Sequence, residues 1–318
     1  MKKAFDTTKN KVIAFLTNKN SLFVVLLFLV LSVLTIGLIL LMVWGVFTSL
    51  KSQINWDDDP VGFPKGAIWN WSWENISLAF SKFIVKVDYT DATGIIVRSK
   101  VPVNIFWMFF YTLVYAGFGA VVNATVTLVM GYMTAKFPYK FSSLITIVVI
   151  TVMALPVVGS YTSELQILMK LGLYNTLYGA IIQKFNFLGL YFLVFQAFFK
   201  SLSNEYSEAA QIDGASEFRI LWQIIVPMSR NILFTVILLL FVGFWNDYQA
   251  PLLYFPSYPT LAYGLYYITA GPGAYETDIS NPPMRLAASM IIFVPILAVF
   301  IVFRNRIIGN VTMGGIKE

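Results

Sequence analysis

The chain has 318 residues, of which 58% are hydrophobic and 12% charged, and it carries a formal net charge of +6. This composition lies outside the range of soluble domains and predicts a membrane protein. Cysteine and histidine are absent, which excludes disulfides, thiolate chemistry and the commonest general base and metal ligand. The chain also lacks a GxxxxGK(S/T) phosphate loop. We therefore expect a protein that is not an enzyme, with no catalytic, cofactor or metal site of its own.

Uncharged runs long enough to cross a bilayer, which needs about twenty apolar residues, recur along the chain. The first run, 21–50, follows five lysines, and it is too long for the apolar part of a signal peptide. The others lie at 101–135 and 141–163, in a stretch that ends at Phe199, in one that begins at Asn231, and at 286–303. Lys184 interrupts the fourth run, and we expect its side chain to reach the outer surface. The sequence therefore predicts an all-α membrane protein with six transmembrane helices.

Basic residues predict the orientation of these helices. The lysines before the first run and the short basic segments after the second, fourth and sixth runs all fall on one face. By the positive-inside rule this face is cytoplasmic, and so are both termini. Because the surplus positive charge lies beside the spans, where it sets orientation, we expect no nucleic-acid partner.

The opposite face carries a long loop at 51–100. Aromatic rings can stack on sugars, but tryptophans that flank a span more often anchor it at the membrane interface or pack within a loop. We read the four tryptophans of this loop in that way: Trp56, Trp69, Trp71 and Trp73. The chain then divides into a cytoplasmic segment at 1–20, a first transmembrane helix at 21–50, an extracellular loop at 51–100, a core of five spans at 101–304 and a cytoplasmic tail at 305–318.

A polar, acid-bearing segment at 204–230 separates the fourth and fifth runs. Glu208 lies near the start of a short predicted helix, where the positive helix end favours an acid, and Ala209 and Ala210 favour helix formation. Gly214 permits a sharp turn. A second helix then carries an apolar stripe and ends at Pro227; the stripe comprises Phe218, Leu221, Trp222 and Ile225. An interfacial helix pair without a partner would explain the stripe, but not the Glu-Ala-Ala, Gly and Pro positions together.

The order and spacing of these residues resembles the EAA loop of permease subunits from binding-protein-dependent ABC importers. In that family the loop is a cytoplasmic coupling helix that docks on a separate ATPase subunit. The resemblance implies a coupling loop at about 201–230, with contacts to the ATPase from Glu208, Ala209, Ala210, Asp213, Gly214 and Pro227. ATP and Mg²⁺ would bind to the partner ATPase subunits, and this chain would bind no cofactor.

Further segments resemble the carbohydrate branch of the family, in particular its maltose-type second permease. They are 171–176 (LGLYNT), 245–247 (WND) with 251–252 (PL), 260–265 (TLAYGL) and the tail 309–317 (GNVTMGGIK). The tail implies contacts with the ATPase from Thr312, Gly314 and Gly315. The departures from the family pattern are Val226, where leucine is usual, Gly315, where alanine is usual, and Asn231, which replaces a proline.

The resemblance implies a transmembrane permease subunit of an ATP-driven importer, which forms the translocation path for a sugar or oligosaccharide. Its partners would be a second related permease in a heterodimer, two ATPase subunits and an extracellular solute-binding protein, in the cytoplasmic membrane of a bacterium. An importer of the same architecture for phosphonate, metal or peptide stays open as an alternative. A secondary transporter also stays open, although the sequence shows no convincing internal repeat and the acidic loop would then have no purpose.

Four polar residues within the spans are candidates for the translocation path or its outer gate: Asn123, Gln196, Asn246 and Asp247. Asn123 lies on a face of small residues that favours close helix packing, which is its alternative role. Asn246 and Asp247 lie near the outer boundary of the fifth span, where an acid costs less than at the membrane centre. Their alternative role is to cap a helix break before Pro251.

Overall fold

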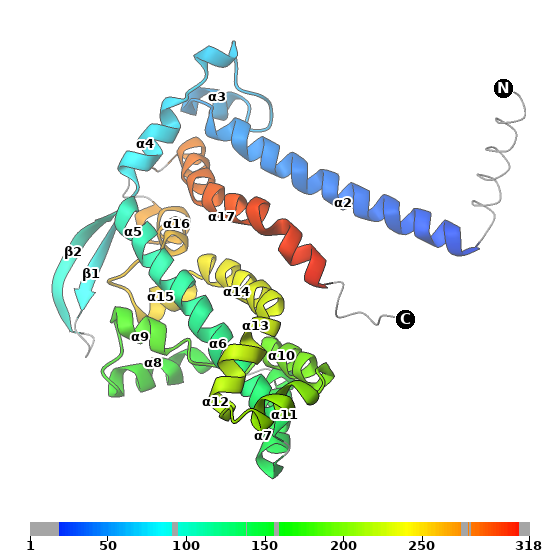
Figure 1. Cartoon of the computed structure of the whole chain (residues 1–318). Coiled ribbons are helices and arrows are strands. Elements are labelled where there is room, and N and C mark those ends of the chain that lie inside the picture. Colours follow the sequence, from blue (N-terminus) through cyan, green and yellow to red (C-terminus); the bar gives the residue numbers. More distant parts are fainter. Residues whose placement is uncertain are drawn as a thin grey trace, which may run out of the picture. The chain divides into compact units, whose positions relative to one another are not determined.

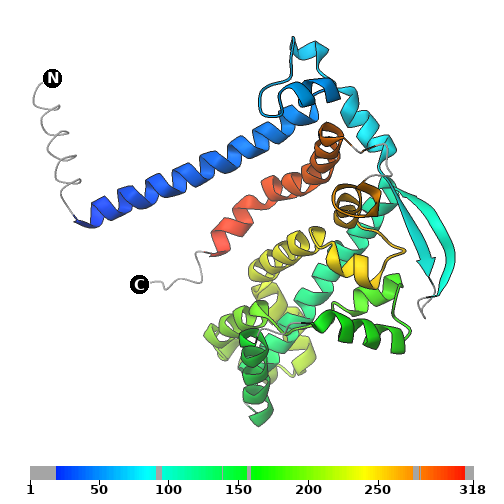
Figure 2. The same cartoon turned by 180° about the vertical axis from the view of Figure 1, so that it is seen from behind.

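The computed structural model describes residues 19–90, 95–137, 139–155, 159–274, 279 and 281–311. The chain is mainly helical, and it divides into two compact units (Figures 1 and 2). The first unit comprises Met1–Ile76 and Asn281–Met290, and the second comprises Ser77–Ser280 and Ile291–Glu318. The predicted tail contacts at Thr312, Gly314 and Gly315 lie outside the described residues, and so does most of the predicted N-terminal segment.

Three helices in the described part of the chain are each long and apolar enough to cross a membrane: Phe23–Ser49, Ile105–Lys136 and Pro282–Phe303. A fourth candidate is a helix pair, Glu217–Met228 and Arg230–Trp245, which bends by 77° at its break. The third and fourth predicted runs form shorter apolar helices, α7 (Lys140–Ala154) and α10 (Leu190–Ser201). Each predicted run therefore contains a helix, while the presence of six complete crossings remains a prediction.

The first unit contains α2 (Lys19–Ser49), which holds the first predicted span. Nearly every side chain from 23 to 43 is exposed within the chain, although almost all of them are apolar. A helix that is apolar on all sides needs an apolar surrounding, which lipid or another apolar protein surface supplies. Near its end α2 meets α17 (Pro282–Val311): a Cβ atom on Gly45 would lie 2.9 Å from Cε of Met290.

After α2 the chain folds into three short helices: α3 (Gln53–Asp58), η1 (Ile68–Asn70) and the beginning of α4 (Glu74–Lys82). The buried Asn75 amide donates hydrogen bonds to the backbone oxygens of Ser49 (3.0 Å) and Lys51 (2.7 Å). These carbonyls lie at the C-terminal end of α2, where helix carbonyls have no partner within the helix. Asn75 therefore closes α2 and ties the start of α4 to it.

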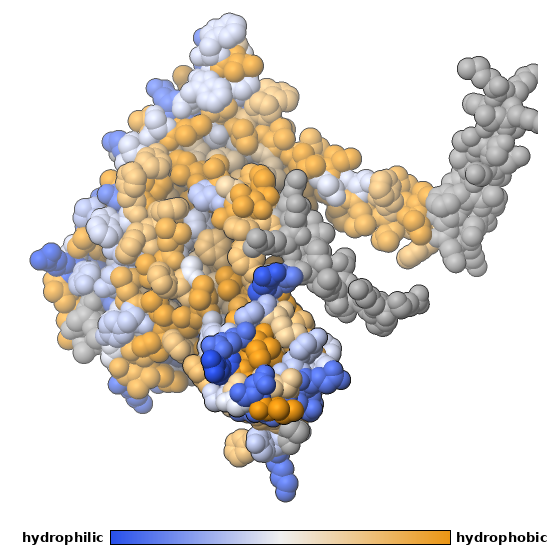
Figure 3. All heavy atoms as spheres, viewed as in Figure 1, coloured by the Kyte–Doolittle hydropathy of each residue, from blue (hydrophilic) through white to orange (hydrophobic). Residues whose placement is uncertain are grey.

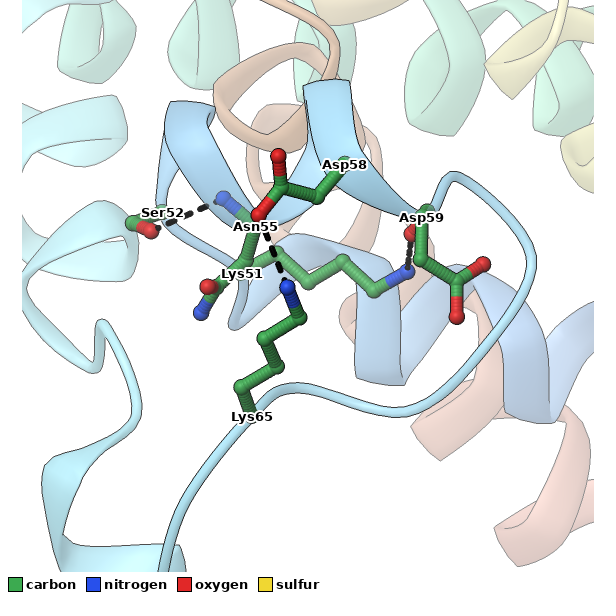
Figure 4. A network of polar contacts seen from close by, with 6 residues as sticks. All are labelled: Lys51, Ser52, Asn55, Asp58, Asp59 and Lys65. Carbon is green, nitrogen blue, oxygen red and sulfur yellow. Dashed lines mark hydrogen bonds and ion pairs between the residues drawn. The ribbon is translucent and has the colours of Figure 1, made fainter.

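A polar network holds the turn after α3 (Figure 4). The side chain of Lys51 is fully buried, and its Nζ donates a hydrogen bond of 2.6 Å to the backbone oxygen of Asp59. The Asp59 carboxylate accepts the backbone N–H groups of Gly62 (2.9 Å) and Val61 (3.1 Å). Because these hydrogen bonds stabilise the charged form, they lower the pKa of the Asp59 carboxyl. An exposed ion pair of 2.7 Å joins Lys65 to Asp58.

The second unit contains an antiparallel hairpin of β1 (Ile84–Thr90) and β2 (Ile96–Asn104), in which Ile84 pairs with Asn104. Val85 and Val87 are buried while Lys86 between them is exposed, which is the alternation of a strand with one covered face. The covered face of β1 contacts α16 (Leu261–Thr269). The chain is mostly helical, as predicted, and this two-stranded hairpin is an addition that the sequence analysis did not predict, because the alternation is too short to stand out beside the long apolar runs.

The second unit is built around one continuous helix, α5 (Ile105–Thr112), η2 (Leu113–Phe118) and α6 (Gly119–Lys136). The middle part, η2, is a π-helical turn. α6 packs against α10 and α14 (Arg230–Trp245), and a Cβ atom on Gly131 would lie 2.8 Å from Cβ of Phe195. The two helices can approach this closely only because Gly131 has no side chain.

The second unit has two structurally distinct ends. At one end lie the hairpin and four short helices (Figures 1 and 2): α8 (Ser160–Lys170), α9 (Leu177–Ile182), α15 (Gln249–Tyr254) and α16. At the other end lie α11 (Glu205–Ile212) and α12 (Glu217–Ile220). Figure 3 shows hydrophobic residues over most of the visible face of this unit and hydrophilic residues gathered over α11 and α12.

Candidate functional site

The segment between α10 and α14 forms a helical hairpin, named here the 205–228 hairpin after its residues. Its first helix, α11, ends at Ile212, and Gly214, two residues further on, has a φ of 80° in the left-handed region. The N–H of Ala215 donates to the oxygen of Ala210 (2.9 Å), and the N–H of Gly214 donates to the oxygen of Gln211 (3.0 Å). This pair of hydrogen bonds is the Schellman motif that ends many helices at a glycine. The structure thus has its turn at the glycine that the sequence indicated.

The second half of the hairpin comprises α12, the π-helical turn η3 (Leu221–Ile225) and α13 (Val226–Met228). Leu221 and Ile225 are buried in the core, whereas Phe218 and Trp222 are exposed, with ring centroids 6.1 Å apart. Leu221 and Ile225 thus form the buried edge of the predicted apolar stripe, and Phe218 and Trp222 form its exposed edge. Residues four apart along a helix share a face, so these two pairs lie on neighbouring faces, one turned inward and one outward.

The predicted coupling residues are divided between the surface and the core. Five of them are exposed: Glu208, Ala209, Asp213, Gly214 and Pro227. Ala210 is only 8% exposed and packs in the core beside Ile220 and Ile225. Ile212 lies between the exposed acids and is itself 87% exposed. An exposed isoleucine beside exposed carboxylates gives this tip both an apolar and an acidic contact surface.

Polar contacts hold the 205–228 hairpin to the rest of the unit. Lys136, the last residue of α6, donates from Nζ to the backbone oxygen of Leu202 (2.6 Å) and to Oδ1 of Asn204 (2.7 Å). Within the hairpin, the Gln211 amide donates to the Glu217 carboxylate across the turn at 2.6 Å. The end of α6 is therefore tied by hydrogen bonds to two residues of the segment that leads into α11.

Two of the predicted path residues join helices in this structure. The Asn123 amide donates to the backbone oxygens of Lys184 (3.1 Å) and Asn186 (2.8 Å). The Gln196 amide, which is buried, donates to Oγ1 of Thr134 (3.0 Å) and of Thr146 (2.8 Å). Since amides buried among apolar groups are stable only when hydrogen-bonded, both residues act here as cross-links between helices.

The other two predicted path residues lie at the end of α14. The Asn246 side chain is exposed, and its amide donates to the oxygen of Val242 in its own helix at 2.9 Å. Asp247 accepts the N–H of Ala250 at Oδ1 (3.1 Å), as the cap of a helix break does, and the Tyr115 hydroxyl at Oδ2 (2.5 Å). Asp247 thus caps the start of α15 and also contacts η2.

Lys184 is the largest departure from the sequence analysis. We expected its side chain at the outer surface, but this residue is only 8% exposed. Its Nζ donates to the Tyr115 hydroxyl (2.7 Å) and lies 4.3 Å and 4.2 Å from the ring centroids of Tyr115 and Phe244. A buried ammonium is costly unless hydrogen bonds, aromatic faces and nearby acids compensate it, and this lysine has all three, since Tyr115 links it to Asp247.

A second acid completes this cluster. The Glu164 carboxylate of α8 accepts the Gln183 amide at Oε1 (2.8 Å) and the Tyr254 hydroxyl at Oε2 (2.9 Å). Sequence reasoning missed both Tyr115 and Glu164 as functional candidates. The signal that was present is Lys184 itself, because an ionisable residue inside an apolar run is by default a functional candidate with a partner to be found.

The residues 127–312 match the protein family described as the binding-protein-dependent transport system inner membrane component. A sulfoquinovosyl glycerol transport system permease protein of Agrobacterium fabrum is 25% identical over 293 residues, which are 91% of this chain and 93% of that protein. A diacetylchitobiose uptake system permease protein of Streptomyces coelicolor is 27% identical over 279 residues, which are 86% of this chain and 82% of that protein.

Among solved structures, a chain of a bacterial ABC transporter involved in the import of the acidic polysaccharide alginate matches with a TM-score of 0.64 at 16% identity. The match covers 91% of this chain and 98% of that chain. The arrangement of helices described above therefore occurs as a fold in an experimentally solved transporter.

Proposed function

Because the chain belongs to the inner membrane components of binding-protein-dependent transport systems, we propose that it is the permease subunit of an ATP-driven importer for a sugar or oligosaccharide. The solute class rests on the relatives, whose names give sulfoquinovosyl glycerol and diacetylchitobiose as cargo. The segments 171–176 and 245–265, which resemble the carbohydrate branch, support the same class. The subunit itself is non-catalytic, and the energy comes from ATP and Mg²⁺ bound by two partner ATPase subunits.

The observation that carries the proposal is the geometry of the 205–228 hairpin. Its tip exposes Glu208, Ala209 and Ile212, and its base is tied through Leu202 and Asn204 to the last residue of α6. A rigid tip that joins the end of a long apolar helix suits the transfer of movement from an ATPase to that helix. We assign ATPase coupling to the exposed side chains of Glu208, Ala209, Asp213 and Pro227, and to Ala210 and Gly214 a role in shaping the tip.

The proposed topology has six spans, with both termini and the 205–228 hairpin in the cytoplasm of a bacterium. The candidate spans support it, since α2, the helix 105–136 and α17 each have the length and composition of a crossing. The tail residues Thr312, Gly314 and Gly315 would then lie on the ATPase side of the membrane. The β1–β2 hairpin and α8, α9, α15 and α16 would lie outside, where a solute-binding protein delivers the cargo.

The translocation path would run between this chain and a second, related permease. Asn246 is the best of the four predicted path residues for direct solute contact, because its side chain is exposed at the end of α14. Asn123, Gln196 and Asp247 would shape the path through the helices that they join.

Reconstitution of the complete complex tests the proposal. The chain purified alone should hydrolyse no ATP, and it should copurify with an ATPase subunit whose activity rises when a sugar-loaded binding protein is added. Uptake of solute into vesicles by this chain alone, driven by an ion gradient, would contradict the proposal and favour a secondary transporter.

A further inference from the structure

Six side chains in the second unit form two hydrogen-bonded chains, which α15 and the neighbouring residues Gln183 and Lys184 connect; the six are named here the polar ring: Tyr115, Glu164, Gln183, Lys184, Asp247 and Tyr254. Lys184 donates to Tyr115, and Tyr115 donates to Asp247, which caps α15. At the other end of α15, Tyr254 donates to Glu164, which also accepts Gln183, the neighbour of Lys184. The ring therefore fixes both ends of α15 to α8, to the end of α9 and to η2.

The charges of the polar ring depend on one another. Its one ammonium group faces two carboxylates, and Tyr115 is the bridge between the ammonium and Asp247. Lys184, Tyr115 and Tyr254 are each less than a tenth exposed. Buried charges stay in place only while their partners do, because a lone charge in this surrounding is strongly disfavoured. The ring is therefore stable in one packing of α15 against the long helix and is lost as a unit when that packing changes.

Two irregularities lie next to the ring and are independent of its charges. Tyr115 lies within η2, a π-helical turn in an otherwise α-helical span, and such turns are frequent at functional sites. Trp245, two residues before Asp247, is 2% exposed, and its indole N–H has no hydrogen-bond partner among the described residues. A buried donor without an acceptor is rare in a packing that is fully optimised. Both features mark this part of the unit as structurally irregular.

One helix joins the ring to the 205–228 hairpin. Tyr115 lies in the helix Ile105–Lys136, and Lys136 lies about 31 Å further along at the usual helical rise. Lys136 is the residue that holds Leu202 and Asn204 at the base of the hairpin. The ring and the hairpin thus contact two separate points of the same packed element, which can carry coupling between them.

We propose that the polar ring, at a distance from the 205–228 hairpin within the second unit, is the site that couples arrival of the solute to the ATPase, with Lys184 and Tyr115 as positioning residues. The proposal rests on the proposed importer function. A change in the packing of α15, α8 and α9 breaks the ring, releases Tyr115 and lets the helix 105–136 shift at Lys136. While the ring is intact, the rate of ATP hydrolysis by the partner subunits depends on the loaded binding protein.

The test compares ATP hydrolysis by the complete complex with and without the loaded binding protein. Tyr115→Phe removes only the bridging hydroxyl, and Lys184→Met removes the ammonium but keeps an unbranched stem. We expect both variants to assemble. The stimulation ratio, which is the rate of ATP hydrolysis with the loaded binding protein divided by the rate without it, should fall about fivefold or more, which is the lower end of ordinary allosteric coupling. The double variant should lose no more than either single variant, since both act through one chain of contacts.

Tyr263→Phe is the matched control, because Tyr263 is a buried tyrosine of α16 outside the ring. The stimulation ratio of this variant should equal that of the wild-type complex. A normal ratio in Tyr115→Phe and Lys184→Met would overturn the proposal. So would loss of the assembled complex, or a fall of basal and stimulated rates by the same factor, since each indicates a purely structural role. A wild-type complex that the binding protein does not stimulate would instead count against the proposed importer function.

Discussion

Asn175 and Ser257 bind each other through two hydrogen bonds, although 82 positions separate them in the chain. The Asn175 amide donates to the Ser257 hydroxyl (2.7 Å), and the Ser257 backbone N–H donates to Oδ1 of Asn175 (2.9 Å). Asn175 has a φ of 54°, which asparagine tolerates better than most residues. The pair explains physically why an asparagine stands in the LGLYNT segment: it joins the turn before α9 to the turn after α15.

This pair gives the first prediction. Asn175→Ala loses both hydrogen bonds, leaves the buried Ser257 N–H without this partner and places an alanine at a left-handed φ. We expect it to lower the free energy of unfolding by about 2–4 kcal/mol. Asn175→Gly loses the same hydrogen bonds without the φ penalty, so it should be less destabilised. Thermal unfolding of the purified variants ranks their stabilities. An alanine variant as stable as the glycine variant would show that the left-handed φ of residue 175 adds no cost to the alanine substitution.

The second prediction concerns Gly214 at the turn of the 205–228 hairpin. No atom lies within 4 Å of the position that a Cβ would take, so a side chain there has space and only the φ of 80° opposes it. Gly214→Val should cost about 1–2 kcal/mol and distort the tip, whereas Gly214→Asn should be tolerated. Both variants should reach the membrane in normal amount.

Copurification of the ATPase subunit and solute uptake provide the measurement for Gly214. We expect the valine variant to lose both and the asparagine variant to keep both. Because the turn lies outside the apolar spans, the effect should appear in coupling before it appears in the amount of inserted protein. Full uptake by Gly214→Val would mean that the 205–228 hairpin is not the coupling element.

The sequence predicted best those features that depend on neighbours along the chain. Apolar runs form the helices α2, α6 and α17, and the turn lies at Gly214, because length, composition and backbone freedom are local properties. The polar segment 204–230 was recognised for the same reason. The order of the Glu, Ala, Gly and Pro residues is local, whereas their division between surface and core is not.

Features that depend on distant partners were missed. Lys184 binds Tyr115, which is 69 positions away, and Tyr115 binds Asp247, which is 132 positions away. Without these partners a lysine in an apolar run reads as a residue that must reach water, so the buried position could not be predicted. The valines of β1 are covered by α16, and a short strand whose cover lies elsewhere in the chain gives only a weak signal.

The third prediction concerns the proposed topology, and the chain suits the test because it has no native cysteine. Single cysteines at Asn10, Ser142 and Asn310 should resist a membrane-impermeant maleimide added to intact cells. Ser72→Cys, in the loop after α2, should react. All four should react after the membrane is opened, which shows that the thiols are accessible. Labelling at Asn310 from outside would contradict a cytoplasmic C-terminus.

The last prediction concerns the contact of α6 with α10. A Cβ on Gly131 would lie 2.8 Å from Cβ of Phe195 and 3.2 Å from the backbone nitrogen of Gln196, so Gly131→Val must push the helices apart. We expect it to lower the free energy of unfolding by about 1–3 kcal/mol and to weaken the Gln196 cross-link. Gly243→Ala is the control: it lies in α14 with no atom within 4 Å of a Cβ, and alanine favours helix, so stability should be equal or higher. Equal thermal stability of purified Gly131→Val and Gly243→Ala would contradict the close contact between α6 and α10.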